Sequence, residues 1–253
     1  MNKKTIIILI LLFIVTYPSF SQVPSYVDTN GLVGWWPFDG NANDISGNGN
    51  NGLVYGATLT TDRFGASNSA YDFDVLNWTW GANGDYIYIP YSSSFNFTEF
   101  TVSTWVKRAS LGSTISAQAL SIIRRYQYGY NSPNGESWVL ELAHGSSVSG
   151  SIVTGAVIQQ SPSPALNFTS SSIQPVPLNQ WTNIVMTYSQ NTIIIYIDGV
   201  LVGSATNPSI TLNVTGNSGI SIGLSDQANG HWSPFDGKID DIGIWNKALD
   251  SNK

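Results

Sequence analysis

The amino-acid sequence predicts an all-β fold, a two-sheet antiparallel sandwich of the jelly-roll type. Apolar and aromatic runs of strand length recur along the chain, and clusters of turn residues separate them. Several of these runs alternate between apolar and polar residues, whereas no segment keeps a sustained helical period. Many strands without helices between them favour two packed antiparallel sheets over a parallel α/β fold.

Individual strands are placed by their composition and by the turns that end them. The predicted strands cover residues 32–38, 85–89, 100–106, 120–124, 138–142, 156–160, 181–188, 192–198, 200–205, 218–224 and 238–245. In the run 100–106, one face carries Phe100, Val102, Thr104 and Val106, and the other carries Thr101, Ser103 and Trp105. Asp198-Gly199 is the strongest hairpin signal in the chain. The Ser- and Pro-rich residues 160–177 are predicted to form a long loop inside one domain.

Length and composition limit the classes of function. The chain has 253 residues, of which 10% are charged and 12% aromatic, so it can bury enough apolar surface to exclude a disordered chain. Its formal net charge of −6 and the scarcity of clustered basic residues exclude nucleic acid as the partner. The chain has no Cys, so its stability must come from its core or from a bound metal.

The first 21 residues have the pattern of a signal peptide. Lys3 and Lys4 precede an apolar run at 5–15, and Ser19-Phe20-Ser21 supplies a cleavage site before Gln22. The run is shorter than the roughly 20 residues that a membrane span requires. We therefore expect residues 1–21 to be a signal peptide, 22–30 a short N-terminal segment and 31–253 one domain. The mature protein is then secreted, extracellular or on a bacterial cell surface, with no membrane span.

Five sequence blocks, in order, carry a resemblance to a known family. They are GWWPFDGNAND (34–44), SGNGNNG (46–52), FTVSTWV (100–106), WTNIV (181–185) with YIDGV (196–200), and GKIDDI (237–242). The set resembles the LamG-like jelly-roll domains of secreted bacterial proteins, which are concanavalin A-like lectin/glucanase domains. The resemblance spans residues 31–249. It implies two stacked antiparallel sheets, one curved into a shallow groove, in a carbohydrate- or protein-binding module. Many relatives continue past this point, so further modules of a longer chain are expected partners.

The N-terminal loop carries the best candidate metal site. Asp39, Asn41 and Asn43 occupy alternate positions, and Asp44 follows directly. Ca²⁺ takes about six to eight oxygen ligands, which alternate side chains of a tight loop can supply. The loop is not an EF-hand, because Asp44 stands where that motif needs Gly. The alternative is a polar turn in which Asn and Asp bond their own backbone.

A carboxylate near the C-terminus adds to this hypothesis. Asp240 alternates with Ile242 and Ile244, so we expect it to point inward, where a carboxylate is costly unless it is paired or bound to a metal. The family resemblance places this closing strand near the N-terminal loop. The sequence therefore predicts a structural Ca²⁺ held by Asp39, Asn41, Asn43, Asp44 and Asp240.

Exposed aromatic side chains are the candidates for ligand binding. Sugar rings pack their C–H faces on Trp or Tyr, and their hydroxyls need polar partners. Side chains spaced two apart in a strand share a face, which favours Trp78 with Trp80 and the series Tyr126, Tyr128 and Tyr130. Trp232 lies in a loop beside His231. For these residues, binding of a polysaccharide or other glycan and plain packing are both open.

The remaining tryptophans in apolar strands are assigned to the core. They are Trp35, Trp36, Trp105, Trp181 and Trp245.

Two alternatives to a non-catalytic binding module are considered. A glycoside hydrolase of the concanavalin A-like glucanase class needs two carboxylates about 5–5.5 Å apart if it retains configuration. Glu136 and Glu141 are spaced so that they lie on opposite faces of a strand, and His144 and His231 are isolated, so no catalytic residue is predicted. The other alternative is a structural spacer within a larger surface protein.

Overall fold

The computed structural model describes residues 22–75, 84–109, 119–125, 136–144, 151–159, 166–209, 212, 218–224 and 234–250. The expected signal peptide at 1–21 lies outside these ranges. No helix within them has the length and the apolar character needed to traverse a membrane.

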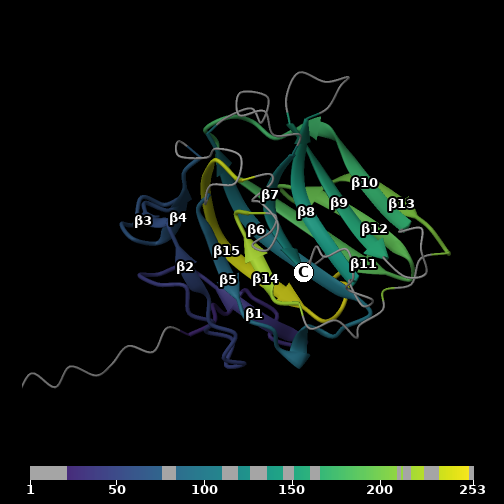
Figure 1. Ribbon diagram of the computed structural model, residues 1–253, viewed down its shortest axis with the longest axis horizontal. Coiled ribbons are helices and arrows are strands. Elements are labelled where there is room, and N and C mark those ends of the chain that lie inside the picture. Colours follow the sequence, from purple (N-terminus) through teal and green to yellow (C-terminus); the bar gives the residue numbers. More distant parts are fainter. Residues whose placement is uncertain are drawn as a thin grey trace, which may run out of the picture.

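The described residues form two antiparallel sheets stacked on each other (Figure 1). Sheet A has the order β13-β12-β11-β6-β15-β4-β3, and β1 pairs with β15. Its strands are β1 (Leu32–Trp36), β3 (Thr58–Thr60), β4 (Ala70–Phe73), β6 (Phe100–Arg108), β11 (Thr182–Ser189), β12 (Thr192–Ile197), β13 (Val200–Thr206) and β15 (Gly237–Trp245).

Sheet B has the order β10-β9-β8-β7-β14-β5-β2. Its strands are β2 (Leu53–Tyr55), β5 (Tyr86–Ile89), β7 (Ala119–Arg125), β8 (Glu136–His144), β9 (Ser151–Gln159), β10 (Leu166–Pro175) and β14 (Ile220–Ile222). A short 3-10 helix, η1 (Ser93–Phe95), follows β5. The predicted all-β, two-sheet sandwich is therefore confirmed.

The core fills the space between the sheets. Strand β6 shows the predicted alternation: Phe100, Val102 and Val106 are fully buried in the main core, which also includes Trp36 from sheet A and Trp138 from sheet B. The predicted hairpin is also present, because Asp198 and Gly199 both have positive φ (48° and 77°) between β12 and β13. A pair of positive-φ residues is the geometry of a type I′ turn.

The prediction of a long loop over residues 160–177 is wrong for strand β10. This strand pairs with β9 along most of its length, and its register shifts between Ser171 and Pro175. At that irregularity the Ser172 hydroxyl accepts from the Val153 backbone N–H (3.0 Å) and donates to the Gln174 carbonyl (2.7 Å). A polar strand that is held in place by hydrogen bonds to a neighbouring strand has no alternating hydrophobic pattern, so it is not recognised from the sequence.

A β-bulge interrupts β15 at its two aspartates. Asp240 pairs with Trp105 of β6 and Gly243 pairs with Ser103, so β15 carries one extra residue between these pairs. Asp241, inside the bulge, has a φ of 44°. An extra residue of this kind breaks the strict alternation of side chains along a strand.

The bulge overturns the predicted direction of Asp240. Ile239, Ile242 and Ile244 all lie in the main core, whereas Asp240 is on the outer face of sheet A, beside its register partner Trp105. Asp240 nevertheless remains only 2% exposed, because other side chains cover it from the outside.

Candidate functional site

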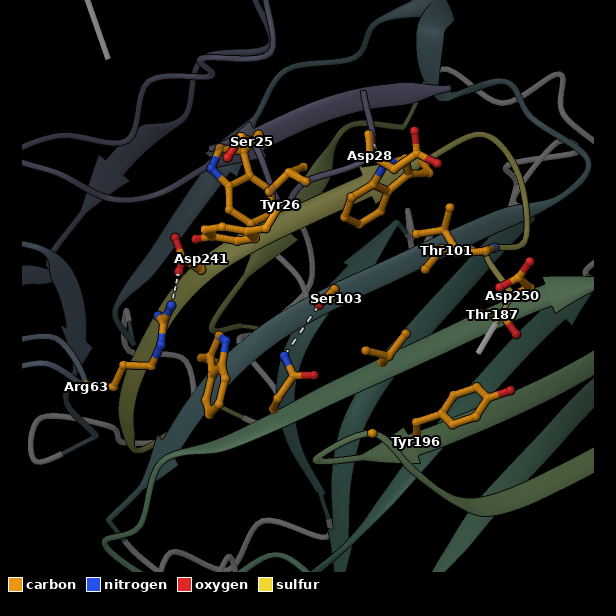
Figure 2. Close-up of a pocket in the computed structure, with 18 residues that line it drawn as sticks. Ser25, Tyr26, Asp28, Arg63, Thr101, Ser103, Thr187, Tyr196, Asp241 and Asp250 are labelled. Carbon is orange, nitrogen blue, oxygen red and sulfur yellow. Dashed lines mark hydrogen bonds and ion pairs between the residues drawn. The ribbon is translucent and has the colours of Figure 1, made fainter. Parts of the chain in front are cut away.

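A pocket of about 540 Å³ lies on the outer face of sheet A (Figure 2). Side chains of β1, β6, β11, β12 and β15 line it, together with residues 25–28 of the N-terminal segment, Arg63 and the C-terminal residues Leu249 and Asp250. Pockets of a few hundred Å³ that combine apolar walls with a few polar groups are typical ligand sites.

Two tryptophans build one wall of the pocket. Trp35 of β1 and Trp245 of β15 meet edge to face, with ring centroids 6.4 Å apart. Their rings lie over Gly243, where a Cβ atom would stand 2.4 Å from the Trp245 ring and 2.9 Å from the Trp35 ring. The wall therefore requires glycine at this position. Trp35 and Trp245 were assigned to the core, and they are buried in a small cluster with Val27 outside the main one.

The N-terminal segment is fixed to this wall. The Trp245 indole N–H donates to the Asp28 carbonyl (2.5 Å), and the Lys247 ammonium pairs with the Asp28 carboxylate (3.1 Å). Tyr26, 73% exposed, stands at the rim of the pocket. Figure 2 shows its ring on the side of Asp241, across the pocket from Tyr196.

The floor consists of short side chains on β6 and β11. The Asn183 side-chain amide donates to the Ser103 hydroxyl (3.4 Å) and to the Thr104 carbonyl (3.2 Å), which orients its carbonyl oxygen. The Asn183 backbone N–H donates to the Asp198 carboxylate (2.8 Å), linking the floor to the β12–β13 hairpin. Tyr196, on the outer face of β12, closes the opposite side.

A charged cluster forms one end of the pocket. The Arg63 guanidinium pairs with Asp240 (2.9 Å) and with Asp241 (2.6 Å). The same guanidinium lies 4.4 Å from the ring centroid of Phe64 and 4.7 Å from that of Trp105. Cation–π contacts of this kind add to the ion pairs. Arg63 is therefore held from several sides, and it covers Asp240.

Burial raises the pKa of the Asp240 carboxyl to about 8. The neighbouring Asp241 carboxylate contributes to this rise, and the Arg63 guanidinium opposes it. Burial is also the main reason why the pKa of Asp241 is raised, and Arg63 again opposes the effect. At neutral pH the buried aspartate thus favours its protonated form beside an ion pair of Arg63 with Asp241.

The assignment of Trp105 and Trp181 to the core is wrong, because both are only partly buried and neither belongs to a core cluster. Trp105 lies at the pocket. Its side chain is half-buried on the outer face of β6, where it lines the pocket beneath Arg63. The alternation in residues 100–106 already placed Trp105 opposite Phe100 and Val102, so its place outside the core was readable from the sequence. Arg63, Asn183, Tyr26 and Tyr196 had no motif that marked them as pocket residues.

Two of the predicted calcium ligands, Asp44 and Asp240, are engaged by other groups of the protein. Asp44 is buried in the N-terminal loop, and its carboxylate accepts three backbone N–H bonds, from Trp35 (3.0 Å), Ser46 (2.8 Å) and Asn50 (2.9 Å). Asp240 instead pairs with Arg63.

The other three predicted ligands are exposed. Asp39, Asn41 and Asn43 lie on the surface of the loop, and the Asn41 side chain accepts from the Asn43 backbone N–H (2.8 Å). Within the part of the chain that the structure describes, no three His, Cys, Asp or Glu residues gather as a metal would need. The calcium site stays a prediction. A melting temperature that falls with EDTA and recovers with Ca²⁺ would confirm it, and an unchanged melting curve would contradict it.

The predicted aromatic ligand residues Trp78, Trp80, Tyr126, Tyr128, Tyr130 and Trp232 lie outside the described residues. They stay predictions. Of the two glutamates considered for catalysis, Glu141 lies on β8, where burial raises the pKa of its carboxyl and the Arg124 cation opposes that shift.

The family model described as the concanavalin A-like lectin/glucanases superfamily matches residues 81–253, more than half of the chain. A comparison with curated proteins finds no match. Among solved structures, domain 4 of AbnA, a GH43 extracellular arabinanase from Geobacillus stearothermophilus solved with arabinotriose, is similar with a TM-score of 0.62 at 19% identity, covering 87% of this chain and 95% of that one.

Two toxin domains are also similar. The binding domain of Paraclostridial Mosquitocidal Protein 1 has a TM-score of 0.64 at 17% identity, with 88% of this chain and 51% of that chain covered. The binding domain of botulinum neurotoxin DC, in complex with SialylT, has a TM-score of 0.58 at 14% identity, covering 88% and 50%. This chain thus spans about half the length of these toxin domains. At such identities the likeness shows a shared fold.

Proposed function

Because the chain belongs to the concanavalin A-like lectin/glucanases superfamily, we propose that it is a non-catalytic carbohydrate-binding module of an exported protein, and that the pocket on the outer face of sheet A holds the glycan. The observation that carries the proposal is the composition of this pocket, in which aromatic rings at the rim and wall surround a polar floor. Arabinotriose in domain 4 of the arabinanase and SialylT in the neurotoxin domain are saccharide ligands of proteins with this fold, which supports the proposal.

The pocket offers the two kinds of contact that a sugar requires. Tyr26, Trp105 and Tyr196 supply ring surface for the apolar C–H faces of a sugar. Asn183 supplies an amide oxygen whose orientation is fixed, and Asp241 supplies carboxylate oxygens at the pocket edge. Sugar hydroxyls can donate to these groups. A pocket of about 540 Å³ has room for a short segment of an oligosaccharide chain.

A binding role without catalysis fits the state of two of the three carboxylates that line the pocket, Asp28 and Asp241. Asp241 is paired with Arg63 at 2.6 Å and Asp28 with Lys247 at 3.1 Å. A general acid or a nucleophile has to be available to the substrate, and a carboxylate held in an ion pair is poorly placed for either task. Assays of reducing-sugar release from a panel of polysaccharides should accordingly detect no turnover.

The decisive experiment removes the half-buried indole. A glycan array followed by isothermal titration calorimetry identifies a ligand of the wild type, and Trp105→Ala should then weaken binding by roughly tenfold or more, as the loss of a stacking aromatic side chain does. Tyr55→Ala is the matched control, since Tyr55 is an exposed aromatic on sheet B, outside this pocket. Circular dichroism and thermal unfolding verify that both variants fold.

Two results would count against this location of the site. Equal affinity of Trp105→Ala and the wild type would exclude the pocket as the binding site. Binding lost in Trp80→Ala or Tyr128→Ala but kept in Trp105→Ala would move the site to the aromatic residues predicted from the sequence. Absence of wild-type binding to every glycan would favour the structural-spacer alternative.

A further inference from the structure

We infer that the pocket on sheet A selects neutral saccharides over anionic ones, because its cationic side chain is held by the protein's own carboxylates. This inference rests on the proposed function and specifies the ligand class. It concerns recognition of uronic acids, sialic acids and other carboxylated sugars, for which a protein normally uses an arginine or lysine.

The charge lining the pocket is unfavourable to an anion. Among the described residues that line it, Arg63 is the one basic side chain, and Asp28, Asp241 and Asp250 are acidic. Lys247 stands close by, but its ammonium is bound to Asp28 at 3.1 Å. A carboxylated sugar would thus meet more negative than positive charge at short range, where unscreened charges interact strongly.

Arg63 is itself engaged on several sides. One guanidinium nitrogen, Nη1, bonds Asp240 at 2.9 Å, and the other, Nη2, bonds Asp241 at 2.6 Å. The central carbon of the guanidinium also lies over two aromatic rings, 4.4 Å from the ring centroid of Phe64 and 4.7 Å from that of Trp105. To bind a ligand carboxylate bidentately, Arg63 would have to leave Asp241 or Asp240. Leaving Asp240 would uncover a carboxyl group that is 2% exposed.

The same arrangement gives Asp241 a direct role in selectivity. Its carboxylate lies at the pocket edge, where it can accept from a neutral sugar's hydroxyl and repels a sugar's carboxylate. The bulge in β15 places Asp240 and Asp241 side by side, where both bind Arg63. Both aspartates therefore help to keep this cation from pairing with a ligand carboxylate. Replacing the two carboxylates by amides of nearly the same shape should release Arg63 toward the pocket.

The test uses matched neutral and anionic probes. Calorimetry with neutral trisaccharides, including arabinotriose, identifies the best neutral ligand, and the same trisaccharide with its primary hydroxyls oxidised to carboxylates is the anionic probe. We expect the wild type to bind the neutral probe at least about tenfold more tightly. In Asp240→Asn/Asp241→Asn this ratio should fall below about threefold or reverse. Adding Arg63→Gln to the double variant should abolish the gained affinity for the anionic probe.

Thermal unfolding of each variant provides the folding control. If the double variant unfolds, Asp241→Asn alone is the milder substitution, and its ratio of neutral to anionic affinity should fall in the same way. Equal binding of both probes by the wild type would overturn the inference while supporting the proposed function. An unchanged ratio in the folded variants would also overturn it, as would anionic binding that survives Arg63→Gln. Failure of the wild type to bind any neutral or anionic probe would overturn the proposed function, and this inference with it.

Discussion

Asp44 and Asp240 are two buried carboxylates that the protein satisfies in different ways. Asp44 accepts backbone N–H bonds from three residues of β1 and the N-terminal loop, so its partners belong to the fold itself. Asp240 pairs with the side chain of Arg63, far away in the sequence, and has a second carboxylate beside it. The first arrangement is set by the backbone of the fold, whereas the second changes with protonation of Asp240 and with the position of one side chain.

The difference separates a carboxylate held by the backbone from one held by a pocket-lining side chain. Asp44 fixes the loop against β1 and does not itself line the pocket; of its three partners, only Trp35 does so. Asp240 lies directly below a pocket-lining cation. Substitution at Asp44 should therefore change stability, and substitution in the Arg63 cluster should change stability and recognition together.

The largest expected effect is that of Asp44→Ala. Three N–H groups would lose a charged acceptor, so the free energy of unfolding should fall by about 3–4 kcal/mol. Urea denaturation monitored by tryptophan fluorescence measures this change. Asp39→Ala, at an exposed carboxylate of the same loop, is the control and should shift stability by less than about 0.5 kcal/mol. Equal effects of the two substitutions would contradict the role assigned to Asp44.

Arg63→Met should have an intermediate effect. The substitution leaves Asp240 and Asp241 without their cation, and breaking a buried pair by removing one partner is costly. We expect a loss of roughly 2 kcal/mol at pH 8.5, reduced from the buried-pair range because Arg63 is partly exposed, and a smaller loss at pH 5, where Asp240 carries a proton. Lys107→Met, on the outer face of β6, is the control and should cost less than about 0.5 kcal/mol. An equal loss of stability at both pH values would show that the contribution of Arg63 does not depend on protonation of Asp240, and would contradict the contrast drawn with Asp44.

The third expected effect is a pH dependence that Asp240→Asn removes. The pKa of Asp240 is raised to about 8 from its ordinary value of 3.8, so the folded state keeps a proton that the unfolded state releases between these values. The stabilisation from this proton is complete below about pH 4 and is lost as the pH rises toward 8. Urea midpoints from pH 4 to 8.5 should therefore fall more steeply in the wild type than in Asp240→Asn. Parallel curves would show that Asp240 is ionised throughout.

Much of the fold could be predicted from the sequence because it depends on local patterns. The alternation in residues 100–106 gives the two faces of β6, and Asp198-Gly199 gives a hairpin, since each depends on neighbours along the chain. Strand β10 could not be predicted in this way, because its order comes from pairing with β9. The short strands β2, β3 and β4 likewise offer too few residues for a period to be recognised.

The candidate site was less predictable because it is assembled from distant segments. The Arg63–Asp240 pair joins residues 177 positions apart, and neither residue belongs to a motif that indicates the other. The predicted direction of Asp240 was wrong because strict alternation holds only in a regular strand. The bulge adds one residue to β15, and two consecutive aspartates are not a sequence signal for a bulge. Trp105 was assigned to the core because it lies within an apolar strand, although its neighbours on the same face, Thr101 and Ser103, are polar.

The bulge in β15 also has an implication for how such a surface can change. Because the surplus residue sits between Ile239 and Ile242, removing either aspartate would leave both isoleucines on the inner side of an ordinary alternating strand. A sandwich can therefore acquire or discard one outward carboxylate by a single-codon insertion or deletion without repacking its interior. Variation in length at this position would be a direct way for related modules to alter their ligand preference.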